Sequence, residues 1–172
     1  QYLIQISSAP SATDELRYAH RLMTLVFGDD SGSRLFWDLV DTGVAEYAVT
    51  GNYEFEGTGI TMGFFSCAPE STSKVMERIT QLKETLISEG VTEEELAMAK
   101  TKLCSQIVRR AERPANRLFS VGNNWVQRAC YVPVCDTIAS YQAVTTADIA
   151  KTLTQHPLTN TSSVLAGPLD SI

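Results

Sequence analysis

The chain of 172 residues has the length of one domain, and its composition, 44% hydrophobic and 20% charged, is that of an ordinary globular protein. Its 14 basic and 20 acidic residues give a net charge of −6, which argues against nucleic acid or an anionic membrane as a partner, because both attract basic surfaces. No apolar run approaches the length that crosses a bilayer. We therefore expect a single domain over residues 1–172 that binds neither nucleic acid nor membrane.

The first residues, QYLIQISSAPSATDEL, contain no Met, no basic stretch and no apolar core of a signal peptide. The chain begins directly in a strand-like run, so we expect it to be a fragment of a longer chain. The compartment stays open. Free thiols favour the cytoplasm, whereas a signal peptide removed upstream would place the protein in the periplasm or outside the cell.

The first part of the chain predicts a strand and a helix. Alternating, β-rich residues predict a strand over 2–7. The helix that follows ends near Phe27, and Gly28 is suited to the left-handed position just past a helix. The inner face of this helix is marked by residues at helical spacing: Leu16, Ala19, His20, Met23 and Phe27.

A second helix and a hairpin come next. The helix is expected to begin near Asp30 or Ser31 and to run to about Thr42, with Gly43 ending it. AEYAVTGNYEF and GITMGFFSC then alternate as strands, and the short link EGTG predicts an antiparallel hairpin. One strand is predicted to place Ala45, Tyr47 and Val49 on one face, and the other Ile60, Met62, Phe64 and Ser66.

The second part of the chain is mainly helical. STSKVMERITQLKETLISEG predicts a helix that Gly90 ends, and the next helix opens with a capping box, Thr92 to Glu95, and closes before Pro114. Shorter helices are expected over 116–128 and 136–143, followed by TTADIAKTL, whose N-cap is Thr145 or Thr146, and by a closing strand in SSVLAGPL. This order predicts a two-layer α+β fold: an antiparallel or mixed sheet with helices mainly on one face.

The segment GDDSGS is similar to GDSGG, which surrounds the nucleophilic serine of chymotrypsin-like proteases, so Ser31 is a candidate nucleophile. Such a serine needs a general base, an orienting acid and an oxyanion hole, and only His20 precedes it, on the apolar face of a helix. The alternative G-x-S-x-G elbow fails because Asp29 stands where its first glycine should be. We interpret the segment as a helix start, with Asp30, Ser31 or Ser33 as N-cap.

The sequence shows no self-contained metal site. His156 stands alone before Pro157, and neither H-x-x-E-H nor H-E-x-x-H occurs. Cys130 and Cys135 lack the second ligand pair that a zinc site would need. The four cysteines are interpreted as free thiols, with a disulfide between Cys130 and Cys135 as the alternative. We expect no catalytic residue, no metal ligand and no bound cofactor in this chain.

Six segments together resemble a known family: GDDSGSRLFWDL, GVAEY, EGTGITMGFFSC, ISEGVTEEELAMAKTKLCSQI, RPANRLFSVGNNW and YQAVTTADIAKTL. In this order they are similar to the C-terminal half-domain of pitrilysin/insulinase-type zinc metallopeptidases, the inverzincins, and to mitochondrial processing peptidase subunits. The resemblance covers nearly the whole chain. It implies a sheet with helices on one side, the LuxS/metallopeptidase half-domain type.

The resemblance also implies roles for particular residues. In that family the zinc and the general-base Glu belong to the other, catalytic half, and the non-catalytic half contributes an Arg and a Tyr that bind substrate, with six residues between them. The tyrosine corresponds to Tyr47, whereas the arginine position is occupied by Val40. Tyr47 is therefore either a hydrogen-bond donor to a peptide carbonyl or a packed strand residue. Arg34 could supply the missing charge, although an ion pair is its expected role.

Three functions follow from these observations. The first is the non-catalytic half of a zinc metalloendopeptidase, which encloses a chamber for peptides or unfolded polypeptides and pairs with a catalytic N-terminal half on the same chain or on a partner subunit. The second is a degenerate binding or scaffold domain, which the missing arginine favours. The third is an independent hydrolase that uses Ser31, which the missing triad argues against.

Overall fold

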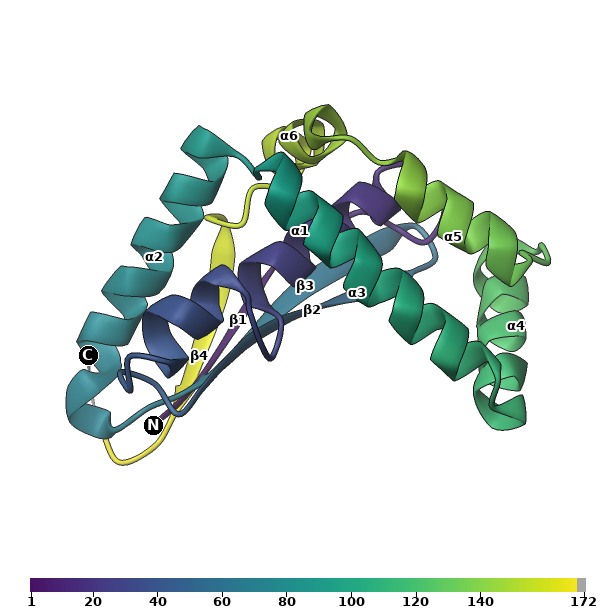
Figure 1. Cartoon of the computed structure of the whole chain (residues 1–172). Helices are drawn as coiled ribbons and strands as arrows, with labels where there is room; N and C mark the ends of the chain where they lie inside the picture. The colour runs from purple at the N-terminus through teal and green to yellow at the C-terminus, as the bar shows by residue number, and fades with distance from the viewer. Residues whose placement is uncertain (170–172) are drawn as a thin grey trace.

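A four-stranded antiparallel sheet forms one layer of the molecule, and the helices pack on one side of it (Figure 1). The computed structural model describes residues 1–169. The strands β1 (Tyr2–Ala9), β2 (Tyr47–Phe55), β3 (Thr58–Ser66) and β4 (Thr161–Ala166) lie in the order β2-β3-β1-β4. The predicted α+β fold is confirmed, and of the two sheet types expected the antiparallel one is present.

The hairpin of β2 and β3 is confirmed. Phe55 and Thr58 form the last pair of its ladder, and Gly57 turns the chain with φ 74°. The expected closing strand pairs with β1, so Val164 lies opposite Ile4. The strand near the start of the chain, β1, is therefore an inner strand of the sheet. The strand near the end of the described chain, β4, pairs with it and forms one edge.

Helix α1 (Arg17–Gly28) lies close to β2, and Gly28 makes this approach possible. The prediction that Gly28 is the left-handed residue past the helix is wrong, because it is the last helical residue and its φ is not positive. A Cβ at this position would come within 2.5 Å of Thr50 Oγ1 and 2.7 Å of Leu35 Cδ1. Glycine is required here by contact rather than by backbone conformation.

The segment after α1 begins its helical turns at Arg34, later than the predicted start at Asp30 or Ser31, and includes the π-helical stretch η1 (Phe36–Val40). Ser33 acts as the cap: its Oγ accepts a hydrogen bond from the Phe36 amide at 3.1 Å. Of the three cap candidates, the one nearest the first helical turn is used. Gly43 follows the helix with φ 73°.

The two longest helices are α2 (Thr72–Glu89), which the short 3₁₀ turn η2 (Pro69–Ser71) precedes, and α3 (Glu93–Ala111). Gly90 separates them with φ 75°, and the capping box between Thr92 and Glu95 forms as predicted. Helix α6 (Thr146–Gln155) is capped by Thr145, through a second capping box with Asp148.

Helices α4 (Pro114–Arg128) and α5 (Val134–Ala143) extend away from the sheet beyond the end of α3 (Figure 1). Each begins two residues before its predicted start, and in α4 proline occupies the first helical position, which its fixed φ suits. No residue of α4 is buried, and its apolar face is exposed: Leu118, Phe119, Trp125 and Val126. Across the described residues, no helix combines the length and the hydropathy of a bilayer-spanning segment.

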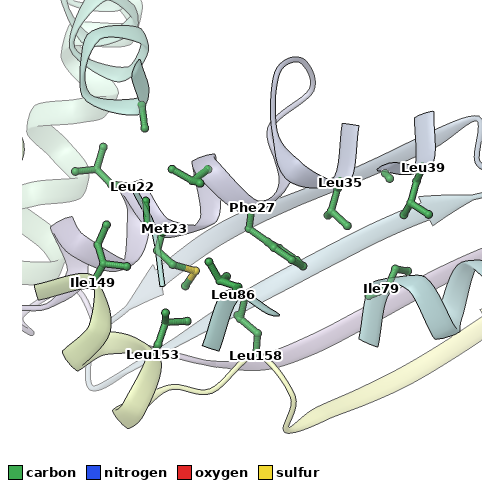
Figure 2. Close-up of a cluster of buried hydrophobic side chains, with 14 of the residues drawn as sticks. Leu22, Met23, Phe27, Leu35, Leu39, Ile79, Leu86, Ile149, Leu153 and Leu158 are labelled. Atoms are coloured by element: carbon green, nitrogen blue, oxygen red, sulfur yellow. The ribbon is translucent and has the colours of Figure 1, made fainter. Parts of the chain in front are cut away.

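The core lies between the sheet and the helices that cover it (Figure 2). Its side chains come from α1, from η1 and the turn that precedes η1, from α2 and α6, and from the loop before β4. They are Leu22, Met23, Phe27, Leu35, Leu39, Ile79, Leu86, Ile149, Leu153 and Leu158. The face predicted for the first helix is confirmed, because its five marked residues are all buried. Burial of these apolar surfaces is the main force that holds the two layers together.

Candidate functional site

The face of the sheet opposite the helices, here called the open face, presents mostly apolar side chains and no charged ones. Successive residues of a strand point to opposite faces, so the pairing of the strands fixes which side chains share this one. Its exposed aromatic and apolar members are Tyr2, Ile6, Tyr47, Tyr53, Phe55 and Val164. None of the sheet positions on this face carries Asp, Glu, Lys or Arg. An uncharged aromatic surface of this extent is typical of a binding surface.

Tyr47 lies at the start of β2 in an aromatic cluster on the open face. Its ring meets that of Phe64 edge to face, with centroids 5.8 Å apart, and Phe64 lies 6.1 Å from the ring of Tyr2 on the other side. The side chain of Tyr47 is 45% exposed, and its hydroxyl has no hydrogen-bond partner among residues 1–169. The ring is therefore held in place, while the hydroxyl is free to bond another molecule.

Backbone hydrogen bonds fix the chain before Tyr47. The Ala45 amide donates to the Leu39 carbonyl at 2.8 Å, and the Glu46 amide donates to the Ser66 carbonyl at 2.8 Å. Tyr47 and Val49 share the open face as predicted, but Ala45, which was expected with them, is buried because it precedes the strand. The first residue of β2 is thus tied both to the helix before it and to β3.

Val40 packs against the core, and Arg34 forms an ion pair with Glu95. Val40 is the last residue of η1 and packs partly buried against the core. Arg34 forms the expected ion pair, donating from Nε and Nη2 to the two carboxylate oxygens of Glu95, each at 2.8 Å, and from Nη2 to the Gly90 carbonyl. Its guanidinium is held between helices, so it does not replace the missing arginine beside Tyr47.

Among residues 1–169, the hydrogen-bond partners of the Ser31 hydroxyl do not include a histidine or another catalytic base. Its Oγ accepts from Lys102 Nζ at 3.0 Å and donates to Asp30 Oδ1 at 3.3 Å. Burial alone would lower the pKa of Lys102, but its bonds to Asp29 and Asp30 outweigh this and raise it. A protonated lysine cannot accept the serine proton, so the structure agrees with the interpretation of Ser31 as a residue of a helix start.

His20 is buried within a chain of hydrogen bonds. Thr61 Oγ1 donates to Asn52 Oδ1, so His20 Nε2 donates to Thr61 Oγ1 at 2.7 Å, and Nδ1 accepts from Thr152 Oγ1 at 3.1 Å. Burial, assisted by the nearby His156, lowers the pKa of His20 to about 3. With both ring nitrogens occupied, this histidine is neither a general base nor a metal ligand.

The remaining candidates do not assemble into a metal centre. The rings of His20 and His156 lie 5.9 Å apart, and no group of three or more potential ligands occurs within residues 1–169. All four cysteines are free, including Cys130 and Cys135. The donor set that a zinc ion requires is therefore not provided by the described part of this chain.

Comparison with known proteins agrees with this description. A family model described as the peptidase M16 inactive domain matches residues 2–103. An uncharacterized zinc protease of Rickettsia felis is 25% identical over 170 residues, which are 98% of this chain and 41% of the relative. An uncharacterized zinc protease of Mycobacterium tuberculosis is 24% identical over 136 residues, 78% of this chain and 31% of that protein. The chain therefore spans less than half of the relatives it matches.

Solved structures with the same fold include two inactive peptidase domains. One, from Pseudomonas fluorescens, has a TM-score of 0.84 at 16% identity and covers 94% of this chain and 39% of that chain. The other, from Bordetella parapertussis, has a TM-score of 0.82 at 16% identity and covers 99% of this chain and 92% of that chain. The fold described above is thus one that recurs at low sequence identity.

Proposed function

Because the chain belongs to the peptidase M16 inactive-domain family, we propose that it is the non-catalytic half of a zinc-dependent metalloendopeptidase that acts on peptides or unfolded polypeptides. The observation that carries the proposal is the open face, an uncharged, aromatic sheet surface, together with the finding that Ser31, the histidines and the cysteines form no active site within residues 1–169. Such a surface serves as one wall of a substrate chamber, because it binds extended chains without selecting one charge pattern.

The partner in this proposal is a catalytic half-domain, on the same chain or on another subunit. Zinc bound there supplies an activated water that attacks the peptide carbonyl. No step of that chemistry is assigned to this chain, since both ring nitrogens of His20 are hydrogen-bonded and no group of three or more potential metal ligands occurs within residues 1–169. The role of this half is to enclose the substrate and hold it against the opposite half.

Tyr47 is the residue of this chain that we assign to the substrate. Its exposed hydroxyl donates a hydrogen bond to a peptide carbonyl, and the edge-to-face contact with Phe64 limits the positions that the ring can adopt. Val40 contributes no charge, and Arg34 is engaged with Glu95. Assistance from this half is therefore a neutral hydrogen bond, not a positive charge.

A scaffold role is the second candidate, and Val40 is the observation that favours it. A valine packed against the core cannot bind a substrate carbonyl, so half of the expected Arg–Tyr pair is lost. In this case the open face would bind a protein partner permanently, and the whole protein would cleave nothing.

The test compares peptide cleavage by the complete protein with cleavage by its catalytic half alone. We expect zinc-dependent cleavage by the complete protein that falls at least about tenfold without this half, because substrate positioning contributes strongly to peptide hydrolysis. We expect the 172-residue chain alone to bind no stoichiometric zinc and to cleave no peptide. Absence of cleavage by the complete zinc-loaded protein would establish the scaffold role, and cleavage by the chain alone that Ser31→Ala abolishes would contradict both.

A further inference from the structure

Arginines collect at the corner where α3 meets α4. The sequence IVRRAERPANR carries four of them, Arg109, Arg110, Arg113 and Arg117, in a chain with a net charge of −6. Arg21 of α1 adds a fifth at the same corner. None of these five takes part in the ion pairs formed within residues 1–169, which use Arg34, Arg78, Lys102 and Arg128.

The helix dipole explains some of this charge but not all of it. Arg109 and Arg110 lie in the last turn of α3, where cations favour the partial negative charge of the helix end. Arg21 lies within α1 and Arg117 in the first turn of α4, so neither is at a helix C-terminus and that explanation does not apply to them. The feature common to these arginines is that their helices surround the same cleft.

This cleft, here called the arginine cleft, has a volume of about 550 Å³ and lies between α1, α3, α4 and α5. Arg21, Arg110 and Arg117 line it from three different helices, and among residues 1–169 no Asp or Glu lines it. A second hollow, lined by Arg109, Arg110 and Arg113, adjoins it through Arg110. The volume is within the range of clefts that bind small molecules or short peptide segments.

The guanidinium of Arg117 is held in position by Tyr131, which does not itself line the cleft. Its Nη2 donates to the Tyr131 hydroxyl at 2.6 Å, and the guanidinium carbon lies 5.5 Å from the centre of that ring. One of its five N–H groups is thereby used, and the others remain for a ligand. An arginine held in this way loses less side-chain entropy when it binds an oxyanion.

We propose that the arginine cleft binds an acidic segment of a peptide, in which carboxylates meet Arg110 and Arg117 and neighbouring apolar side chains meet Ile107 and Phe119. Guanidinium groups bind carboxylates through two parallel hydrogen bonds, which accounts for the charge. We favour a peptide over a free phosphate because a peptide also contacts the apolar part of the lining, whereas a phosphate would not. That this peptide is substrate rests on the proposed function, while the binding itself does not.

The test is calorimetric titration of the 172-residue chain with two capped peptides, one with two glutamates among leucines and one with glutamines in their place. We expect the glutamate peptide to bind at least about tenfold more tightly, and its affinity to fall as salt rises. Arg110→Gln and Arg117→Gln should each weaken its binding about tenfold, because each removes a charge-assisted hydrogen bond. Lys74→Gln, which removes the same charge from the exposed face of α2, should leave it unchanged.

Circular dichroism of each variant shows that the fold is kept. Equal affinity for the two peptides, or binding unaffected by Arg110→Gln, would overturn the proposal. Inorganic triphosphate that binds in an arginine-dependent way while the glutamate peptide does not would also overturn it, and would identify a small-oxyanion site. Because the catalytic half is not needed here, a failed titration beside successful cleavage by the complete protein would reject the cleft and leave the proposed function standing.

Discussion

Arg34 and Glu95 form a two-pronged ion pair, with Nε to Oε1 and Nη2 to Oε2 both at 2.8 Å. Glu95 also accepts from the Thr92 amide as the second half of the capping box at the start of α3. The pair therefore joins the SRLF segment to the GVTEEEL segment, which lie far apart in the sequence. Both side chains are mostly shielded from solvent, so this link is stronger than a pair on the surface.

Arg34→Gln should lower the free energy of unfolding by about 2–3 kcal/mol, because it leaves a partly buried carboxylate without its partner. The matched control is Arg78→Gln, since the Arg78 side chain pairs with Asp38 at a more exposed position, and a smaller cost than that of Arg34→Gln is expected. Urea unfolding at neutral pH measures both. Equal costs would show that the shielding of Arg34 has no effect.

The same pair predicts a response to acid. Hydrogen bonding from Arg34 is the main cause that lowers the pKa of Glu95 to about 2. The unfolded chain then takes up protons that the folded chain does not, so stability present above about pH 4.5 is lost as the pH falls toward 2. Unfolding measured between pH 5 and 2 should show a flatter dependence for Arg34→Gln.

His20 predicts a second, separate pH dependence. Its pKa is lowered to about 3, so the folded chain keeps it neutral while the unfolded chain protonates it near 6.5. Stability is fully present above about pH 6.5 and falls, by a few kcal/mol at most, as the pH decreases toward 3. His20→Gln should remove this slope. An unchanged slope between pH 6.5 and 5 would contradict the neutral, hydrogen-bonded state of the ring.

Lys83 is a buried cation that has no acidic partner among residues 1–169. Its Nζ donates to Gln5 Oε1 at 2.7 Å, and burial lowers its pKa to about 8. The unfolded chain holds this proton more tightly, so stability should rise with pH between about 8 and 10.5, and the cost of the charge is fully present below pH 8. Lys83→Met should raise the free energy of unfolding at pH 7 by about 1–2 kcal/mol and abolish that rise. Destabilisation by Lys83→Met in thermal unfolding would contradict this account.

Replacement of Gly28 by alanine is expected to cause a steric clash, and Gly122 provides the matched control. Gly28→Ala places a Cβ against Thr50 and Leu35, so we expect a loss of about 2–3 kcal/mol. Gly122, in the exposed middle of α4, has no atom within 4 Å of its added Cβ, and Gly122→Ala should stabilise by about 0.5–1 kcal/mol through helix propensity. Chemical denaturation of both variants checks the opposite signs.

Tyr47→Phe tests the substrate contact in the complete protein. Removal of the hydroxyl should lower kcat/KM for peptide cleavage by about tenfold, with little change in stability, because the ring and its contact with Phe64 remain. Tyr53→Phe is the matched control, since Tyr53 lies on the same strand and the same face with similar exposure. An unchanged kcat/KM for Tyr47→Phe would assign Tyr47 to packing alone, and an equal loss for Tyr53→Phe would contradict a specific role for Tyr47.

Much of the fold could be predicted from local pattern. The capping box at Thr92, the helix ends at Gly43 and Gly90 and the hairpin turn in EGTG each depend on residues within a few positions, and the structure confirms them. Gly28 shows where such reasoning fails, because its neighbours Thr50 and Leu35 come from other elements. Helix α4 begins at Pro114, two residues before its predicted start, for a simpler reason. Proline is as well suited to the first turn of a helix as it is to the position that ends the preceding one.

Periodicity, caps and residue types are properties of short segments, so the elements and the sheet-and-helix class could be predicted from the amino-acid sequence alone. Tertiary packing was needed to show which side of the hairpin is open, that Arg34 is held by Glu95, and that arginines from three helices line one cleft. These relationships join residues distant in the chain, and their geometry depends on how the layers pack, which no local pattern specifies.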